Sequence, residues 1–199
     1  MVYILMLKVK SSIRLVVLSN PFLYVLKTFM QGKVQGIGYN LVNKRTDICV
    51  EGFARSGNTF ALHLLKVVET NLNIAHHSHS IANIKLAFRR GVPVICLIRN
   101  PIDAITSWVI RENGESGWDY QKAAYYAIAQ YRQFVIFILN NQNKMQIIDF
   151  NILVNNTKEF LAIVAKTIPN LVSAVEDIRI NMMLDKTMSS IKEEAQAQR

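Results

Sequence analysis

Asp47-Ile48-Cys49-Val50-Glu51-Gly52-Phe53-Ala54-Arg55-Ser56-Gly57-Asn58-Thr59-Phe60 is the stretch that decides the fold of this 199-residue chain. Its apolar residues 48–50 predict a buried strand, and an apolar helix is expected over 59–71, after a polar turn. Gly52 and Gly57 have the G-x-x-x-x-G spacing of a phosphate-binding loop, and Thr59 supplies the hydroxyl that follows in such loops. Glycine lets a backbone approach an anion, and the first turn of a helix presents unpaired N–H groups to it. The stretch therefore predicts a phosphate site.

The cation of this loop is not where a nucleotide-hydrolysing loop carries it. Such loops have a lysine between the second glycine and the hydroxyl residue. This chain has Asn58 there, and its cation is Arg55, three residues earlier. The positive charge therefore moves from the far end of the expected cradle to its middle.

Further apolar stretches alternate with amphipathic ones along the chain. Two more strands are predicted, one within residues 91–98 and one over 145–150, and helices are expected over 81–90, 101–111, 118–140 and 157–167. Residues 112–117, which are polar and contain glycine, predict a loop. Alternating strands and helices predict an α/β fold with three αβα layers around a central parallel sheet, and a ligand at the carboxyl ends of the strands.

The predicted helices carry recognisable start and stop signals. Ser80 is expected to cap helix 81–90, and Gly91 is expected to end it. Asn100 is a good N-cap for the next helix, Pro101 suits its first position and Asp103 complements its dipole.

Residues 1–46 form a hydrophobic extension before the first predicted strand. Asn20-Pro21 interrupts the apolar run 13–30, so we expect one or two helices there. Three interpretations stay open: the helices pack on the core, lie in a membrane interface through residues 1–30, or span a membrane, which needs about 20 mostly apolar residues. A signal peptide is not favoured, because no small-residue cleavage site follows a short apolar core. We divide the chain into the extension 1–46, a nucleotide-binding domain 47–185 and a polar tail 186–199.

The formal net charge is +9, which favours anionic partners. Nucleic acid is not expected among them, because the lysines and arginines are scattered and no nucleic-acid motif appears. Cys49 and Cys96 each lie in an apolar run and are expected to be buried thiols. A reducing, cytoplasmic setting is therefore the simpler expectation, with membrane association as the alternative.

Arg55-Ser56-Gly57-Asn58-Thr59-Phe60 resembles the loop with which sulfotransferases hold the 5′ end of 3′-phosphoadenosine 5′-phosphosulfate (PAPS). The family pattern is a basic residue, Ser or Thr, Gly, any residue, Thr and an aromatic. The resemblance implies that Arg55 contacts the transferring sulfonate and that Phe60 lies at the adenine-stacking position. It implies that the 5′-phosphate is bound by Ser56, Gly57, Asn58 and Thr59.

A second motif follows a predicted strand: Arg99-Asn100-Pro101-Ile102-Asp103-Ala104-Ile105-Thr106-Ser107. It is similar to the 3′-phosphate motif of the same family, R-[ND]-P-x-D-x-x-x-S. The resemblance implies that Arg99 and Ser107 converge on the 3′-phosphate. Arginine suits this role because its fork donates two parallel bonds to phosphate oxygens. The alternative for Arg99 is a structural ion pair with Asp103.

A histidine-rich segment, His76-His77-Ser78-His79, lies between the two motifs. Many family members have their general base here, and a neutral histidine nitrogen can accept the proton of a hydroxyl. His77 is our first choice because of its distance along the chain to Arg99, and His79 is the second. His76 is expected at the surface. A zinc site is the alternative for the three histidines, but no fourth ligand is apparent, so no metal is predicted.

Together the two resemblances imply a P-loop NTPase-like sulfotransferase fold and an enzyme that transfers a sulfonate from PAPS to a hydroxyl acceptor, a carbohydrate or another small alcohol. The strand 145–150 loosely resembles a later family strand, with Phe150 in its aromatic position. The chain departs from the pattern because no basic, glycine-rich closing segment follows Phe150. Two alternatives stay open: a P-loop kinase or hydrolase with Asp149 as a magnesium ligand, and a non-catalytic, membrane-associated protein on a degenerate sulfotransferase fold.

Overall fold

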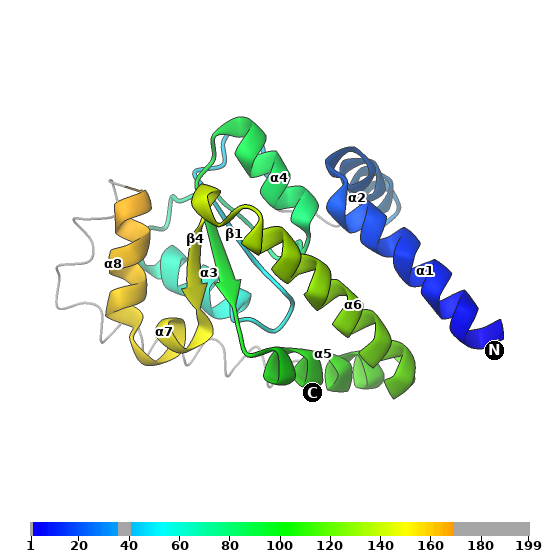
Figure 1. Ribbon diagram of the computed structural model, residues 1–199. Coiled ribbons are helices and arrows are strands. Elements are labelled where there is room, and N and C mark those ends of the chain that lie inside the picture. The colour runs from blue at the N-terminus through cyan, green and yellow to red at the C-terminus, as the bar shows by residue number, and fades with distance from the viewer. Residues whose placement is uncertain (1, 36–40, 169–199) are drawn as a thin grey trace.

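The computed structural model describes residues 2–35 and 41–168, with the side chains of 9–32 and 41–168 (Figure 1). Its elements are α1 (Val2–Ser19), α2 (Pro21–Gln35), β1 (Ile48–Gly52), α3 (Asn58–Val68), β2 (Ile74–His76), α4 (Ile81–Arg90), β3 (Val94–Ile98), α5 (Pro101–Ser116), α6 (Tyr120–Leu139), the 3-10 turn η1 (Gln142–Lys144), β4 (Gln146–Asp149), α7 (Phe150–Asn155) and α8 (Thr157–Thr167). The predicted tail 186–199 and the end of the predicted domain lie outside the described residues.

The four strands form one parallel sheet in the order β2-β1-β3-β4. Helices cover both of its faces, so the predicted α/β fold with a central parallel sheet is confirmed (Figure 1). Within the sheet, β2 lies next to β1 on one side, and β3 and β4 follow on the other side of β1. The strand order therefore reverses between β1 and β3, and the carboxyl ends of this strand pair are where open α/β sheets bind ligands.

Side chains of β1 alternate between two apolar clusters, as the period of a strand requires. Ile48 and Val50 pack with α3 and α8 on one face. Cys49 packs with α4 and α6 on the other face. Both cysteines are buried free thiols, as predicted.

The predicted helix signals are confirmed. Ser80 accepts a hydrogen bond from the N–H of Asn83 and caps α4, which ends at Gly91 with φ 66°. Asn100 accepts from the N–H of Ile102 and caps α5, with Pro101 in its first turn.

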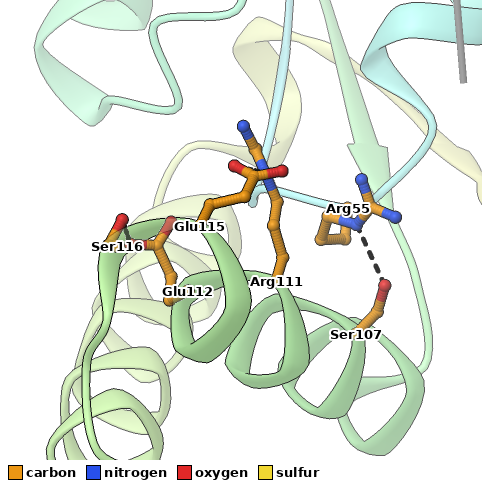
Figure 2. Close-up of polar contacts among 6 residues, drawn as sticks. All are labelled: Arg55, Ser107, Arg111, Glu112, Glu115 and Ser116. Atoms are coloured by element: carbon orange, nitrogen blue, oxygen red, sulfur yellow. Dashed lines mark hydrogen bonds and ion pairs between the residues drawn. The ribbon is translucent and has the colours of Figure 1, made fainter. Parts of the chain in front are cut away.

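The loop predicted over 112–117 is wrong, because α5 continues to Ser116 and ends at Gly117. Two contacts between side chains four residues apart hold this extra turn: Arg111 pairs with Glu115 at 2.7 Å, and Ser116 donates to Glu112 at 3.0 Å (Figure 2). Such pairs stabilise a helix turn. The turn matters because it carries Glu115, the ion-pair partner of Arg111, and Arg111 lines the site described below.

Besides the turn η1, two short elements were not predicted. Strand β2 has three residues and pairs in register with β1. Helix α7 has six residues and is capped by Asp149, so Phe150 begins a helix instead of ending a strand. Both elements lie beside the predicted site.

The N-terminal helices are separate, as the Asn20-Pro21 interruption predicted. The side chain of Asn20 accepts from the N–H groups of Phe22 and Leu23 and starts α2. Leu18 and Tyr24 are buried in a cluster shared with α4, α5 and α6, so this extension packs on the core. No single helix in the described ranges is long and apolar enough to cross a membrane; Val9–Ser19 and Pro21–Gly32 are apolar enough together but are bent by 99°.

Candidate functional site

The turn after β1 forms a cradle at the start of α3. Gly57 is the N-cap residue with φ 89°, and no side chain caps the helix. The first-turn N–H groups of α3 have no acceptor within the helix, so they remain available to an anion. A Cβ at Gly57 would lie 2.8 Å from a methyl carbon of Leu153, so this position needs glycine for space as well as for its dihedral angles.

Gly52 has a different role from the one its spacing predicts. It is not among the positive-φ glycines of the described residues. A Cβ at Gly52 would lie 2.6 Å from the carbonyl oxygen of Leu97 in the adjacent strand β3. The first glycine therefore allows β1 and β3 to lie close together, and the left-handed backbone in the turn occurs at Arg55, with φ 71°, and at Gly57.

The two predicted motifs meet. Arg55 Nε donates a hydrogen bond of 2.9 Å to Ser107 Oγ across 52 residues of chain (Figure 2). Arg99 donates from its guanidinium to the carbonyl oxygen of Arg55, also at 2.9 Å. The alternative for Arg99, an ion pair with Asp103, is not present among the described residues.

A pocket of about 340 Å³ opens over this contact. Its lining is Arg55, Gly57, Asn58, Thr59, Phe60, His77, His79, Arg99, Arg111, Phe150 and Val154. Eight of the predicted site residues are therefore brought together. The remaining two, Ser56 and Ser107, lie next to the pocket, Ser56 buried in the turn and Ser107 bonded to Arg55.

Three buried polar atoms of the site have no hydrogen-bond partner among the described residues: Ser56 Oγ, Asn58 Oδ1 and Arg99 Nε. Buried polar atoms are nearly always paired, so such a group of atoms is typical of a ligand-binding site. The Ser56 hydroxyl and the Arg99 N–H are donors, which suits the oxygens of a phosphate. Phe150 supports this arginine, because Arg99 Cζ lies 4.4 Å from the ring centroid.

The charge of the pocket is positive. Three guanidinium groups line it, from Arg55, Arg99 and Arg111, and none of the lining residues in the described part of the chain is acidic. Burial, followed by the charges of Arg111 and Arg99, lowers the pKa of Arg55. Arg111 is partly neutralised by Glu115 outside the lining (Figure 2). This field favours a ligand with more than one negative charge.

Glu51 holds the histidine segment in place. This fully buried carboxylate accepts hydrogen bonds from the main-chain N–H and hydroxyl of Ser78, the N–H of His79 and the side-chain amide of Asn83. Burial raises the pKa of Glu51 to about 7, although these hydrogen bonds lower it in part. His77 and His79 have left-handed backbones, with φ 57° and 47°. Such conformations are costly for histidine and persist where surrounding contacts enforce them.

His79 has the tautomer of a base. Its Nδ1 lies 3.1 Å from the carbonyl oxygen of Gly52, which can only accept, so Nδ1 carries the hydrogen and Nε2 carries the lone pair. Burial lowers the pKa of His79 to about 4, with the nearby His77, Arg111 and Arg55 charges adding to the effect. The ring is therefore neutral at pH 7.

His77 contacts the cradle directly, because its Nε2 lies 2.9 Å from Thr59 Oγ1. Its other nitrogen contacts Nδ1 of His76. The predicted surface position of His76 is wrong, since His76 ends β2 half-buried, and burial lowers its pKa to about 4. Across residues 2–35 and 41–168, no group of three or more His, Cys, Asp or Glu side chains is placed to hold a metal ion.

Sequence reasoning missed Glu51 and Arg111 as parts of this site. The signal for Glu51 was available, since it is a lone carboxylate in an otherwise apolar strand. Asp149, the alternative magnesium ligand, accepts from the N–H of Asn151 at 2.7 Å and caps α7. A scan of the chain against models of known protein families finds no match, and a search of curated proteins finds none either.

Proposed function

We propose that this chain is a sulfotransferase that moves a sulfonate group from PAPS to the hydroxyl of a carbohydrate or another small alcohol. The observation that carries the proposal is the hydrogen bond between Arg55 and Ser107. It joins the cradle suited to a 5′-phosphate to the arginine–serine pair suited to a 3′-phosphate. One doubly phosphorylated adenosine can therefore reach both anion sites from one pocket.

The unpartnered atoms support this ligand more than a single phosphate. Ser56 Oγ belongs to the cradle, whereas Arg99 Nε belongs to the second motif, and both are buried donors without an acceptor among the described residues. Two phosphates held apart by a ribose would satisfy both sets. Phe60 and Phe150 line the same pocket and supply apolar surface for the adenine ring.

In the proposed reaction the acceptor oxygen attacks sulfur while the bond from sulfur to the bridging oxygen breaks. The electron pair of that bond leaves with the 5′-phosphate, whose growing charge is stabilised by Arg55 and the start of α3. The hydroxyl proton moves to a histidine. The site also lowers the barrier by holding the acceptor oxygen, the sulfur and the bridging oxygen in line.

We assign the base to His79 in preference to His77. The Nε2 lone pair of His79 is set by the Gly52 carbonyl, while Nε2 of His77 already contacts Thr59. A pKa of about 4 is low for a base at pH 7, but nearby arginine charges help to lower it. Binding an anionic donor offsets those charges, so the pKa of His79 moves toward the working pH.

The test begins with calorimetry of the full chain and adenosine 3′,5′-bisphosphate. We expect saturable binding that Arg55→Gln and Arg99→Gln each weaken by roughly 10- to 100-fold, since each removes a charged hydrogen-bond donor. Arg132→Gln, on an exposed face of α6, is the matched control and should bind as the parent does. Absence of heat with the folded parent, or displacement by ATP with magnesium instead, would overturn the proposal.

Labelled PAPS with pooled glycans, lipids and small alcohols then tests turnover. We expect labelled product from the parent and at least 100-fold less from His79→Asn, within the range that a general base contributes. Bisphosphate binding without transfer to any pool would favour the non-catalytic alternative. Equal turnover by Arg55→Gln would count against the catalytic role of the cradle.

A further inference from the structure

Helices α1 and α2 expose two apolar stripes while their opposite faces are buried. The stripe on α1 contains Val9, Ile13 and Val16, spaced four and three residues apart on one face. The stripe on α2 contains Phe22, Val25, Leu26, Phe29 and Met30. All eight are between 41% and 74% exposed, whereas Leu18 and Tyr24 on the buried faces are at most 7% exposed. Large apolar side chains gathered at the surface in this way indicate an interaction site.

The charge of this region identifies the partner. Residues 1–46 contain no aspartate or glutamate, and their charged residues are Lys8, Lys10, Arg14, Lys27, Lys33, Lys44 and Arg45. A second copy of this chain would bring the same positive charge and would be repelled. An anionic lipid surface attracts it, and each lysine or arginine near such a surface strengthens binding by roughly fivefold.

A cationic pocket of about 230 Å³ lies beside the α1 stripe. Lys10 and Arg14 of α1 face Lys122 of α6 across it, and its remaining lining is Ser11, Trp118 and Tyr126. Lys10 and Arg14 each directly follow a residue of the stripe in sequence, so the pocket flanks the apolar surface. Glu112 accepts a hydrogen bond from Ser116 and lies outside this lining (Figure 2).

Tyr126 gives this pocket an unused donor. Its side chain is 2% exposed, and its hydroxyl hydrogen has no acceptor among the described residues. Burial raises its pKa to about 12, so the hydroxyl stays protonated. Arg14 Cζ lies 4.2 Å from the Tyr126 ring centroid, and Lys122 Nζ lies 4.1 Å from that of Trp118. The pocket thus offers three cations and a hydroxyl to an anion with several oxygens.

We propose that α1 and α2 bind the surface of an anionic lipid membrane, with the two stripes at the boundary between the headgroups and the acyl chains and a phospholipid phosphate in the Lys10–Arg14–Lys122 pocket. The 99° bend supports two helices lying along an interface better than one crossing it. A crossing would also pull Leu18 and Tyr24 out of their core cluster. The proposal does not depend on the sulfotransferase assignment.

The test is flotation of the full chain with vesicles of phosphatidylcholine alone or with 30% phosphatidylglycerol. We expect the chain to bind the vesicles with phosphatidylglycerol at least tenfold more strongly than those of phosphatidylcholine alone. High salt should abolish this difference. Phe22→Ser with Phe29→Ser should reduce binding at least tenfold. Ile102→Ser is the matched control, because Ile102 on α5 is 74% exposed, as Phe22 is, and lies away from the stripes.

The pocket is tested separately from the stripes. Arg14→Gln with Lys122→Gln, and Tyr126→Phe alone, should each lower the preference for phosphatidylglycerol while circular dichroism stays unchanged. Equal binding to both vesicle types would overturn the proposal, as would resistance to carbonate extraction, which indicates insertion across the bilayer. Saturable binding of soluble glycerol phosphate without vesicles would reassign the pocket to a free anion. A lipid-free dimer that Phe22→Ser dissociates would assign the stripes to a second copy.

Discussion

The carboxylate of Glu51 accepts a hydrogen bond of 2.9 Å from the main-chain N–H of His79, so a strand residue in the core fixes the position of the candidate base. The carboxylate also binds Ser78 and Asn83, so all of its contacts are with donors. An apolar side chain at this position leaves buried donors without acceptors.

Glu51→Ala should therefore lower the free energy of unfolding by at least about 3 kcal/mol, because each buried unsatisfied group costs about 1–3 kcal/mol. Glu51→Gln keeps the shape but turns an amide N–H₂ toward donors, so we expect a smaller loss. Urea unfolding measures both. Asp103→Asn, at an exposed position in the first turn of α5, is the control and should change stability by less than about 1 kcal/mol. A neutral effect of Glu51→Ala would contradict the anchoring role.

Stability should depend on pH through Glu51 and His79 with opposite signs. The folded pKa of Glu51, about 7, lies above its ordinary value of 4.5, so its contribution is present below pH 4.5 and lost as pH rises to 7. The folded pKa of His79, about 4, lies below its ordinary 6.5, so its contribution is lost as pH falls from 6.5 to 4. Unfolding free energies from pH 4 to 7 should rise more steeply with pH in Glu51→Gln than in the parent. They should rise less steeply in His79→Asn, and unchanged slopes in both variants would refute these shifts.

Arg111 and Glu115 should affect ligand affinity in opposite directions. Their ion pair is about half exposed, so removing either partner should change stability by less than about 1 kcal/mol. Arg111→Gln removes positive charge from the pocket and should weaken adenosine 3′,5′-bisphosphate by roughly 3- to 10-fold. Glu115→Gln releases Arg111 and should tighten binding by roughly 2- to 5-fold. Calorimetry at two salt concentrations measures both changes in affinity. If both variants bound more weakly, or both more tightly, the result would count against an electrostatic cause.

Substitution by alanine should change the free energy of unfolding in opposite directions at Gly57 and Gly114. Gly57→Ala meets a left-handed backbone and a contact of 2.8 Å with Leu153, so we expect a loss of about 2–4 kcal/mol in the free energy of unfolding. Gly114 lies inside α5 with nothing within 4 Å of a Cβ, so Gly114→Ala should gain about 0.5–1 kcal/mol. Thermal and urea unfolding of the two variants test the pair, and a stable Gly57→Ala protein would show that the turn can relax.

The sequence predicted those features whose causes are local. Ser80 and Gly91 determine the ends of α4 through their own side chain and dihedral angles, and short apolar runs are enough to indicate β1 and β3. Strand β2 is three residues long and is held by its pairing with β1, so no local pattern indicates it. The additional turn of α5 depends on side-chain pairs that offset Gly114.

For the candidate site too, the sequence indicated individual residues but not the contacts that they make in the fold. Motif spacing identified Arg55 and Arg99, but neither their contact nor the packing role of Gly52 follows from spacing, because both depend on how β1 and β3 pair. The choice between His77 and His79 depends on which polar atom lies beside each ring, the Gly52 carbonyl at His79 and the Thr59 hydroxyl at His77. A tautomer of this kind is a property of the folded neighbourhood.

Helix α7 closes the pocket from a part of the chain that neither arginine motif contains. Phe150 stacks against Arg99, and Leu153 packs over Gly57. A recombinant fragment that stopped after α6 would retain both motifs intact and would still lack one wall of the pocket. Engineering based on motif boundaries alone would therefore yield an incomplete pocket, and a transplant of this site into another scaffold has to include β4 and α7.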